Sequence, residues 1–206
     1  MLRPRKQASR LLLGLCLWLA VSVGLFLLLG PLYSKAVLSL SEFVLRPFLA
    51  TAVTLNEVLG RGIMLSYPGI PQPLGFRFQL PSITLNLVFA TALVMTTMRA
   101  TSGWPQSLLH ILYAVLVMLA LHTYHVVVLI MHFLTQAPNP LVAPRLAGWL
   151  GDLFHINYGF ADKMGYTLFP FLAWVGVCHR QILSLLGTFG KESGLKPDTG
   201  AERPEE

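Results

Sequence analysis

The sequence predicts an all-α membrane protein: four transmembrane helices with an outer amphipathic helix and a small β-hairpin. Of its 206 residues, 54% are hydrophobic and only 12% are charged, and the mean hydropathy is +0.64. Soluble domains carry about 25% charged residues, so this chain has too little charge to cover a soluble globule. The same composition excludes a disordered chain and a collagen-like chain, and two cysteines are too few for a disulfide framework.

The first transmembrane helix is predicted over residues 11–32, after a basic cytoplasmic start over residues 1–10. The run has no charged side chain, and about 20 mostly apolar residues suffice to cross a bilayer. Four basic residues precede it: Arg3, Arg5, Lys6 and Arg10. A basic flank favours a cytoplasmic N-terminus. The run is longer than the core of a signal peptide and no A-x-A-like site follows it, so we expect it to stay uncleaved.

Three further spans are predicted over residues 82–98, 108–133 and 164–186. The first two of these contain no Asp, Glu, Lys or Arg, and the last closes on a basic end and contains Pro170, which we expect to bend it. Residues 99–107 would form a cytoplasmic loop, and residues 187–206, mostly polar and charged, a disordered cytoplasmic tail. Basic residues are denser on the side of the termini, which predicts that both termini are cytoplasmic.

Residues 33–81 form the first predicted outer segment. Residues 36–59 are apolar, but Glu42, Arg46 and Pro47 fall near their middle. An arginine at the centre of a span costs about 2.5–3.5 kcal/mol, so we expect a helix lying on the outer membrane face, with a fifth span as the alternative.

A β-hairpin is predicted next, because residues 61–67 and 74–80 alternate apolar and polar side chains around a Pro-rich turn. The second outer segment, residues 134–163, is predicted to be a proline-rich loop with a short amphipathic helix near residues 146–154. Side chains of the first outer segment are our candidates for contact with a partner: Phe43, Arg46, Phe48, Phe76 and Phe78.

Histidines mark one face of the third span. At 100° per residue, His122, His125 and His132 fall, with His110, within an arc of about 120°. Ionisable groups in a span usually face the bundle interior, so we expect this face to be buried. The favoured interpretation is neutral imidazoles that hydrogen-bond across helices. A haem or transition-metal site is the alternative, although no cofactor is predicted because the predicted spans contain no carboxylate.

Small and polar residues of the other spans suggest packing rather than catalysis. Cys16, Ala20 and Gly24 have the i, i+4, i+8 spacing of a helix-packing stripe, and Asn86 and Thr91 are candidates for hydrogen bonds between helices. Cys178 has no nucleophile motif around it, and the sequence contains no P-loop, G-x-S-x-G, H-E-x-x-H or C-x-x-C motif. No catalytic residue is therefore predicted, and a non-enzymatic protein is favoured.

The order of elements resembles a known family. A basic start leads into a span rich in leucine, an outer segment contains Val44-Leu45-Arg46-Pro47-Phe48, and the last span reads Leu168-Phe169-Pro170-Phe171-Leu172-Ala173-Trp174 before His179-Arg180. This layout is similar to that of the exosortase-associated small membrane proteins of Gram-negative bacteria, particularly the exosortase H-associated type.

The resemblance implies an accessory protein of the bacterial inner membrane. Its expected contacts are membrane lipid and an exosortase-like protease or the substrate of that protease, and not nucleic acid. The motifs of the protease itself find no match in this chain. Two other classes remain open at this point: a metal- or haem-binding membrane protein that uses the histidines, and a small-solute transporter.

Overall fold

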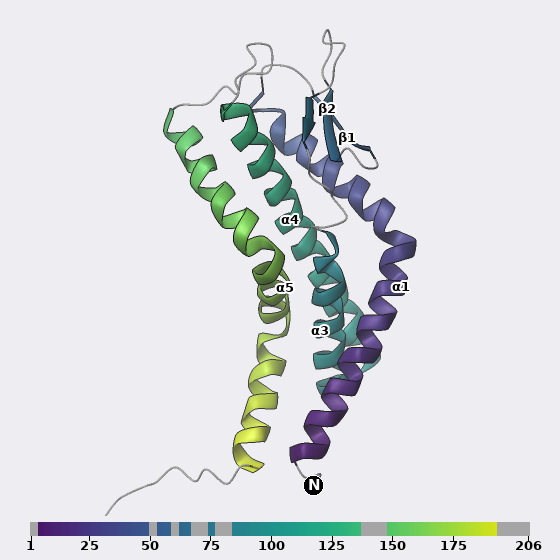
Figure 1. Ribbon diagram of the computed structural model, residues 1–206. Helices are drawn as coiled ribbons and strands as arrows, with labels where there is room; N and C mark the ends of the chain where they lie inside the picture. Colours follow the sequence, from purple (N-terminus) through teal and green to yellow (C-terminus); the bar gives the residue numbers. More distant parts are fainter. Residues whose placement is uncertain are drawn as a thin grey trace, which may run out of the picture.

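The computed structural model describes residues 4–49, 53–58, 62–66, 74–76, 84–136 and 148–192. The elements in these ranges are α1 (Pro4–Leu45), β1 (Thr54–Val58), β2 (Gly62–Ser66), β3 (Leu74–Phe76), α3 (Asn86–Thr101), α4 (Trp104–Gln136) and α5 (Gly148–Glu192). The helices run up and down in turn, so that the start of α1 and the end of α5 lie at one end of the bundle (Figure 1). The sheet lies at the other end.

Three helical segments are long and apolar enough to cross a membrane. They are Ala8–Leu45, Trp104–Gln136 and Thr167–Gly187. The chain is therefore a mostly helical membrane protein with a small antiparallel sheet. Four spans were predicted, but the described part of the chain has three helices of at least 18 residues that are apolar enough to cross a membrane. α3, the second predicted span, has only 16 residues.

The predicted outer helix over residues 36–59 is wrong in its boundaries. α1 continues without a break from the first span through Pro31 to Leu45, and the second half of the predicted helix contains strand β1. Neither a separate interfacial helix nor a fifth span exists in the described residues of this segment.

Packing explains why α1 continues so far. Its upper part buries a regular stripe of side chains, namely Ser34, Val37, Leu38, Ser41 and Leu45. This spacing of three and four residues makes one helical face that packs against the interior. The helix ends where Pro47 disfavours helical backbone in the residue before it and removes an N–H donor.

The predicted hairpin is present, and a third strand extends it. β2 and β3 pair antiparallel, and β1 adds to the other edge of β2, in the order β1-β2-β3. Leu55 of β1 is paired with Leu65 of β2, and both side chains are buried. The Glu42 carboxylate accepts a hydrogen bond from the Leu55 backbone N–H, which fixes the end of α1 to the sheet.

One hydrophobic core joins the sheet to the helices. It combines Val37 and Leu45 of α1 with Ile63 and Leu65 of β2 and with the last three turns of α4, from Val126 to Leu134. We call this part of the molecule, with the facing start of α5, the outer layer. Apolar side chains of the other half of the bundle are largely exposed, among them many leucines of α1 and α5, as expected of a surface that faces lipid.

The amphipathic helix predicted near residues 146–154 is present, but it is longer than predicted. It is the start of α5, which begins at Gly148 and continues into the fourth predicted span, so residues 155–163 are helical as well. The backbone of α5 departs from helical values at Cys178 (φ −112°, ψ 15°), beyond Pro170. Phe78 and most of the predicted tail lie outside the described residues.

Two neighbouring leucines of α1 test the buried face of its extension. Leu38 is 7% exposed and Leu40 is 39% exposed. We expect Leu38→Ala to lower the free energy of unfolding by about 2–5 kcal/mol, because it leaves a cavity in the core, and Leu40→Ala to lower it much less. Thermal unfolding of both variants in detergent measures the difference, and equal losses would contradict the packing described here.

Candidate functional site

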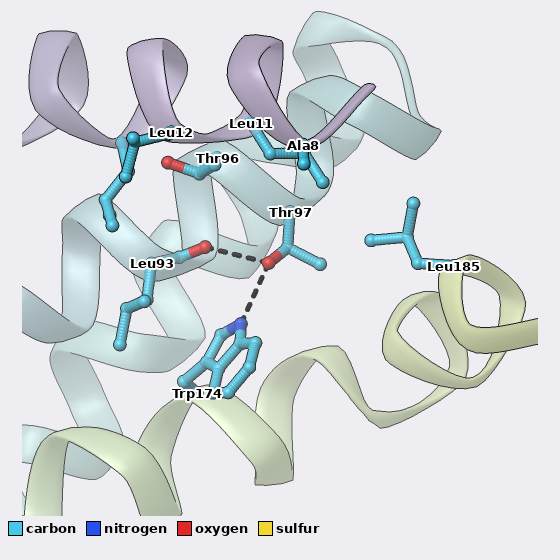
Figure 2. A pocket seen from close by; sticks show the side chains of 9 residues that line it. Ala8, Leu11, Leu12, Leu93, Thr96, Thr97, Trp174 and Leu185 are labelled. Carbon is cyan, nitrogen blue, oxygen red and sulfur yellow. Dashed lines mark hydrogen bonds between the residues drawn. The ribbon is translucent and has the colours of Figure 1, made fainter. Parts of the chain in front are cut away.

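Side-chain hydrogen bonds of α3 connect it to two of the helices that it contacts, α1 and α5, as predicted for Asn86 and Thr91. The Asn86 amide donates to the Gly165 carbonyl of α5 at 3.3 Å, and the hydroxyls of Thr91 and Ser22 hydrogen-bond at 3.1 Å. On the other side, the Trp174 indole N–H donates to the Thr97 hydroxyl at 2.9 Å (Figure 2). α3 is therefore held between α1 and α5.

Three of the four histidines on this face of α4 are buried, as expected, whereas His110 is half-buried. His122, His125 and His132 are at most 8% exposed. The His122 Nδ1 atom shares a hydrogen bond of 2.8 Å with the Tyr33 hydroxyl of α1, a partner that sequence reasoning missed because it lies 89 residues away. His122 Nε2 is buried without a hydrogen-bond partner among the described residues.

His125 faces Gly165 of α5. A Cβ atom added at Gly165 would lie 3.1 Å from His125 Nδ1, so a larger residue there would have to displace the histidine ring. The His125 ring also packs edge-on against Phe169 at 6.1 Å, and Asp162 interacts with it electrostatically. This histidine therefore fills the contact between α4 and α5.

His132 belongs to an aromatic stack in the outer layer. Its ring lies parallel to the Tyr158 ring at 4.0 Å, and the His155 ring is 5.0 Å away. Burial, and then the nearby Asp162 carboxylate, raise the pKa of Tyr158 above its ordinary value. The stack is a packing contact between α4 and α5.

In the described part of the chain, no further metal ligands gather beside the histidines. Across residues 4–49, the three strands and residues 84–136 and 148–192, no group of three or more His, Cys, Asp or Glu side chains is placed to hold a metal ion. His122 Nδ1 is already occupied by Tyr33. The three histidines instead contact different partners, one on α1 and two on α5.

The cysteine-containing stripe lies on the wrong side of α1 for packing within this chain. Cys16 is exposed, and a Cβ atom at Gly24 would meet nothing within 4 Å. α1 approaches α3 through Gly14 and Ser22 instead. The spacing of Cys16, Ala20 and Gly24 correctly predicts that they share one face of α1, but it does not predict which helix face packs against a neighbouring helix. Cys178 is fully buried in a core cluster of α3, α4 and α5.

An apolar groove runs along the bundle with α1 and α5 as its walls and α3 as its floor (Figure 2). It consists of two cavities of about 370 and 360 Å³ that share Leu15 and Leu93. Leu185 lines one of the two cavities and Asn86 lines the other. Apart from Thr96, Thr97, Thr167 and the polar groups of Asn86 and Trp174, the lining is hydrocarbon.

A third cavity, of about 390 Å³, adjoins the groove at the end near the N-terminus. It contains Arg10 and Arg99 and shares Leu11, Thr96 and Leu185 with the groove. We call it the arginine mouth. Its aromatic border is Trp18, whose ring centroid lies 6.0 Å from that of Trp104. The Arg99 guanidinium lies over the Trp104 ring at 4.2 Å.

The predicted contact residues are only partly on the surface. Phe43 is 67% exposed and Arg46 is exposed, whereas Phe48 is half-buried and packs edge-on against Phe154 at 6.4 Å. Phe76 lies in β3, paired with Ile63.

An exposed apolar stripe lies on α5 in the outer layer: Trp149, Leu153, Ile156 and Phe160. The sequence predicted interfacial positions for Trp149 and Phe160, but not that they share one helical face with Leu153 and Ile156. We call this face the α5 stripe. Its spacing of four, three and four residues is that of a helix-packing seam. The spacing is visible in the sequence once the segment is taken as helical.

The bond between Tyr33 and His122 gives a testable prediction. Tyr33→Phe leaves a buried imidazole nitrogen without its partner, so we expect a loss of about 1–3 kcal/mol in the free energy of unfolding. Adding His122→Leu should recover much of that loss, because both polar groups are then absent. Tyr113→Phe, at an exposed position of α4, is the control. Equal unfolding temperatures for Tyr33→Phe and Tyr113→Phe would contradict the role of this bond.

Comparison with known proteins agrees with the resemblance drawn from the sequence. No curated protein and no solved structure matches the chain. A family model described as exosortase H-associated membrane protein matches residues 5–181, a range that includes all three strands, α3, α4 and most of α1 and α5. The chain belongs to the family of exosortase H-associated membrane proteins.

Proposed function

We propose that this protein is a non-enzymatic accessory protein of the bacterial inner membrane that binds an exosortase-type protease or its substrate. The observation that carries the proposal is the family match over residues 5–181. The exposed apolar surface of the outer layer supports it, since large contiguous apolar patches mark sites of interaction with proteins or membranes.

The proposed membrane placement has four crossings with both termini in the cytoplasm. α3 lies between α1 and α5 at the same depth, tied to Ser22 on one side and to Gly165 on the other. At 1.5 Å per residue its 16 residues measure about 24 Å, close to the ~30 Å hydrocarbon core. Arg10 and Arg99 then mark the cytoplasmic face, where basic residues are favoured.

The outer layer provides the proposed contact surface for a protein partner. The α5 stripe exposes Trp149 (66%) and Ile156 (70%), on a helix that α4 holds from the opposite side. Tyr124 of α4 donates to the Asn157 side chain at 2.7 Å, which fixes the rotation of α5 about its axis. A rigid apolar stripe is what a helix of a partner packs against.

A second contact is proposed within the membrane. Cys16, Ala20 and Gly24 are exposed on α1 and are small, so another helix can approach the α1 backbone there. Close approach of this kind drives helix association in lipid, where burial of apolar side chains contributes little. The partner's helix would pack on this stripe, on the side of α1 away from α3.

Cysteine labelling tests the four crossings. In a chain with Cys16→Ala and Cys178→Ala, we expect Ser39→Cys to react with a membrane-impermeant maleimide applied from the periplasm. Ser102→Cys, between α3 and α4, should react only after the inner membrane is permeabilised. Labelling of both from the periplasm would show that α3 does not cross.

Co-purification tests the contact surface. We expect the double change Trp149→Ser and Ile156→Ser to weaken capture of the co-expressed exosortase at least roughly tenfold, since each central apolar anchor contributes about 2 kcal/mol. Point changes on the surface are used because deleting the hairpin would also remove Ile63 and Leu65 from the core and so destabilise the fold. Leu40→Ser in the same layer is the control. Undiminished capture by the double variant would contradict the proposed surface.

A further inference from the structure

We propose that the groove and the arginine mouth together bind one anionic phospholipid. The acyl chain would lie between α1 and α5 on the floor formed by α3, and the phosphate would lie between Arg10 and Arg99. This inference needs the groove to lie in the bilayer, but it does not depend on the exosortase partner.

The shape of the groove fits an acyl chain. On α1 its lining extends from Ala8 to Leu19, about 16 Å at 1.5 Å per residue. This length is close to half of the ~30 Å hydrocarbon core, the depth of one leaflet. Each cavity is also within the ~300–1,000 Å³ range of small-molecule sites.

The floor of the groove presents little that a hydrocarbon chain would disfavour. The Thr97 hydroxyl donates to the Leu93 carbonyl and accepts from the Trp174 indole (Figure 2). The Thr96 hydroxyl donates to the Ala92 carbonyl at 2.8 Å. Because both threonine hydroxyls already donate hydrogen bonds to backbone carbonyls of α3, they do not need a polar ligand as a partner.

The charge at the mouth selects the headgroup. Arg10 and Arg99 line one cavity, and none of the described residues that line it is acidic. Trp18 and Trp104 lie beside them, and tryptophan is enriched at the headgroup level of membranes. Guanidinium groups bind phosphate oxygens in a bidentate manner, so the mouth fits an anionic phosphodiester better than an uncharged or zwitterionic headgroup.

A partner helix would need a different surface. Leu185 and Thr96 line both the groove and the mouth, so a single ligand that fills both cavities must have a negative charge directly next to its hydrocarbon part. A phospholipid has this structure, with its phosphate and its acyl chains joined at the glycerol, whereas a transmembrane helix of a partner is apolar along its length. We therefore infer a lipid rather than a helix in the groove.

Quenching of Trp174 by brominated lipid tests the proposal. The full-length chain with Trp18→Phe, Trp104→Phe and Trp149→Phe keeps one tryptophan, in the groove. In vesicles of phosphatidylcholine with increasing brominated phosphatidylglycerol or brominated phosphatidylcholine, we expect the brominated phosphatidylglycerol to quench Trp174 at a lower mole fraction. A basic residue near an anionic surface contributes roughly fivefold in affinity, so the preference should be at least about fivefold.

Matched variants assign that preference to the mouth. Arg10→Gln with Arg99→Gln should remove the preference for phosphatidylglycerol, whereas Arg46→Gln, at the far end of α1, should keep it. Ala8→Phe, at an exposed position that lines the groove, should reduce quenching by both lipids without loss of folding. Its folding is checked by circular dichroism.

Three results would overturn the proposal. Equal quenching by the two lipids would show that the headgroup is not selected. A preference that survives loss of both arginines would place the anion elsewhere. Absence of quenching by either lipid would show that the groove is filled by protein, from this chain or from another helix.

Discussion

The hydrogen bonds that α3 makes with its neighbours hold this bundle together. In lipid, apolar side chains gain little by leaving one hydrocarbon surroundings for another, so close packing and polar contacts decide which helices associate. Asn86, Thr91 and Thr97 make such contacts with α5 and α1. Because α3 joins α1 to α5, the groove between these two helices depends on it as well.

The molecule combines two kinds of packing along the same helices. In the outer layer, α1, α4 and the sheet bury a continuous apolar core, as a soluble domain does. In the other half, the helices expose leucines, bury only small apolar clusters between α3, α4 and α5, and meet at α1 through Gly14 and Ser22. Two histidines of α4, His122 and His125, lie where these two kinds of packing join, at Tyr33 and Gly165. Their role in the structure is to connect helices.

Local patterns predicted the elements, and non-local contacts decided their extents. Alternation over residues 61–67 and 74–80 identified the hairpin, and uncharged runs identified the centres of the spans. The continuation of α1 to Leu45 depends on core side chains of α4 more than 80 residues away, which no local pattern contains. The same reason hid Tyr33 as the partner of His122, and it made the outward orientation of Cys16 and Gly24 invisible to spacing alone. The groove could not be predicted from local patterns either, because its lining comes from three helices, α1, α3 and α5.

The unbroken length of α1 has a mechanical consequence. Its 42 residues measure about 63 Å at 1.5 Å per residue, twice the hydrocarbon thickness, with the sheet fixed near one tip through Glu42 and Arg10 near the other. A helix adapts to a thinner bilayer by tilting. α1 contains Pro31 and bends along its length (Figure 1), because a proline inside a helix removes a backbone hydrogen bond. Tilting of the arm that lies in the bilayer therefore reaches the sheet through this bend.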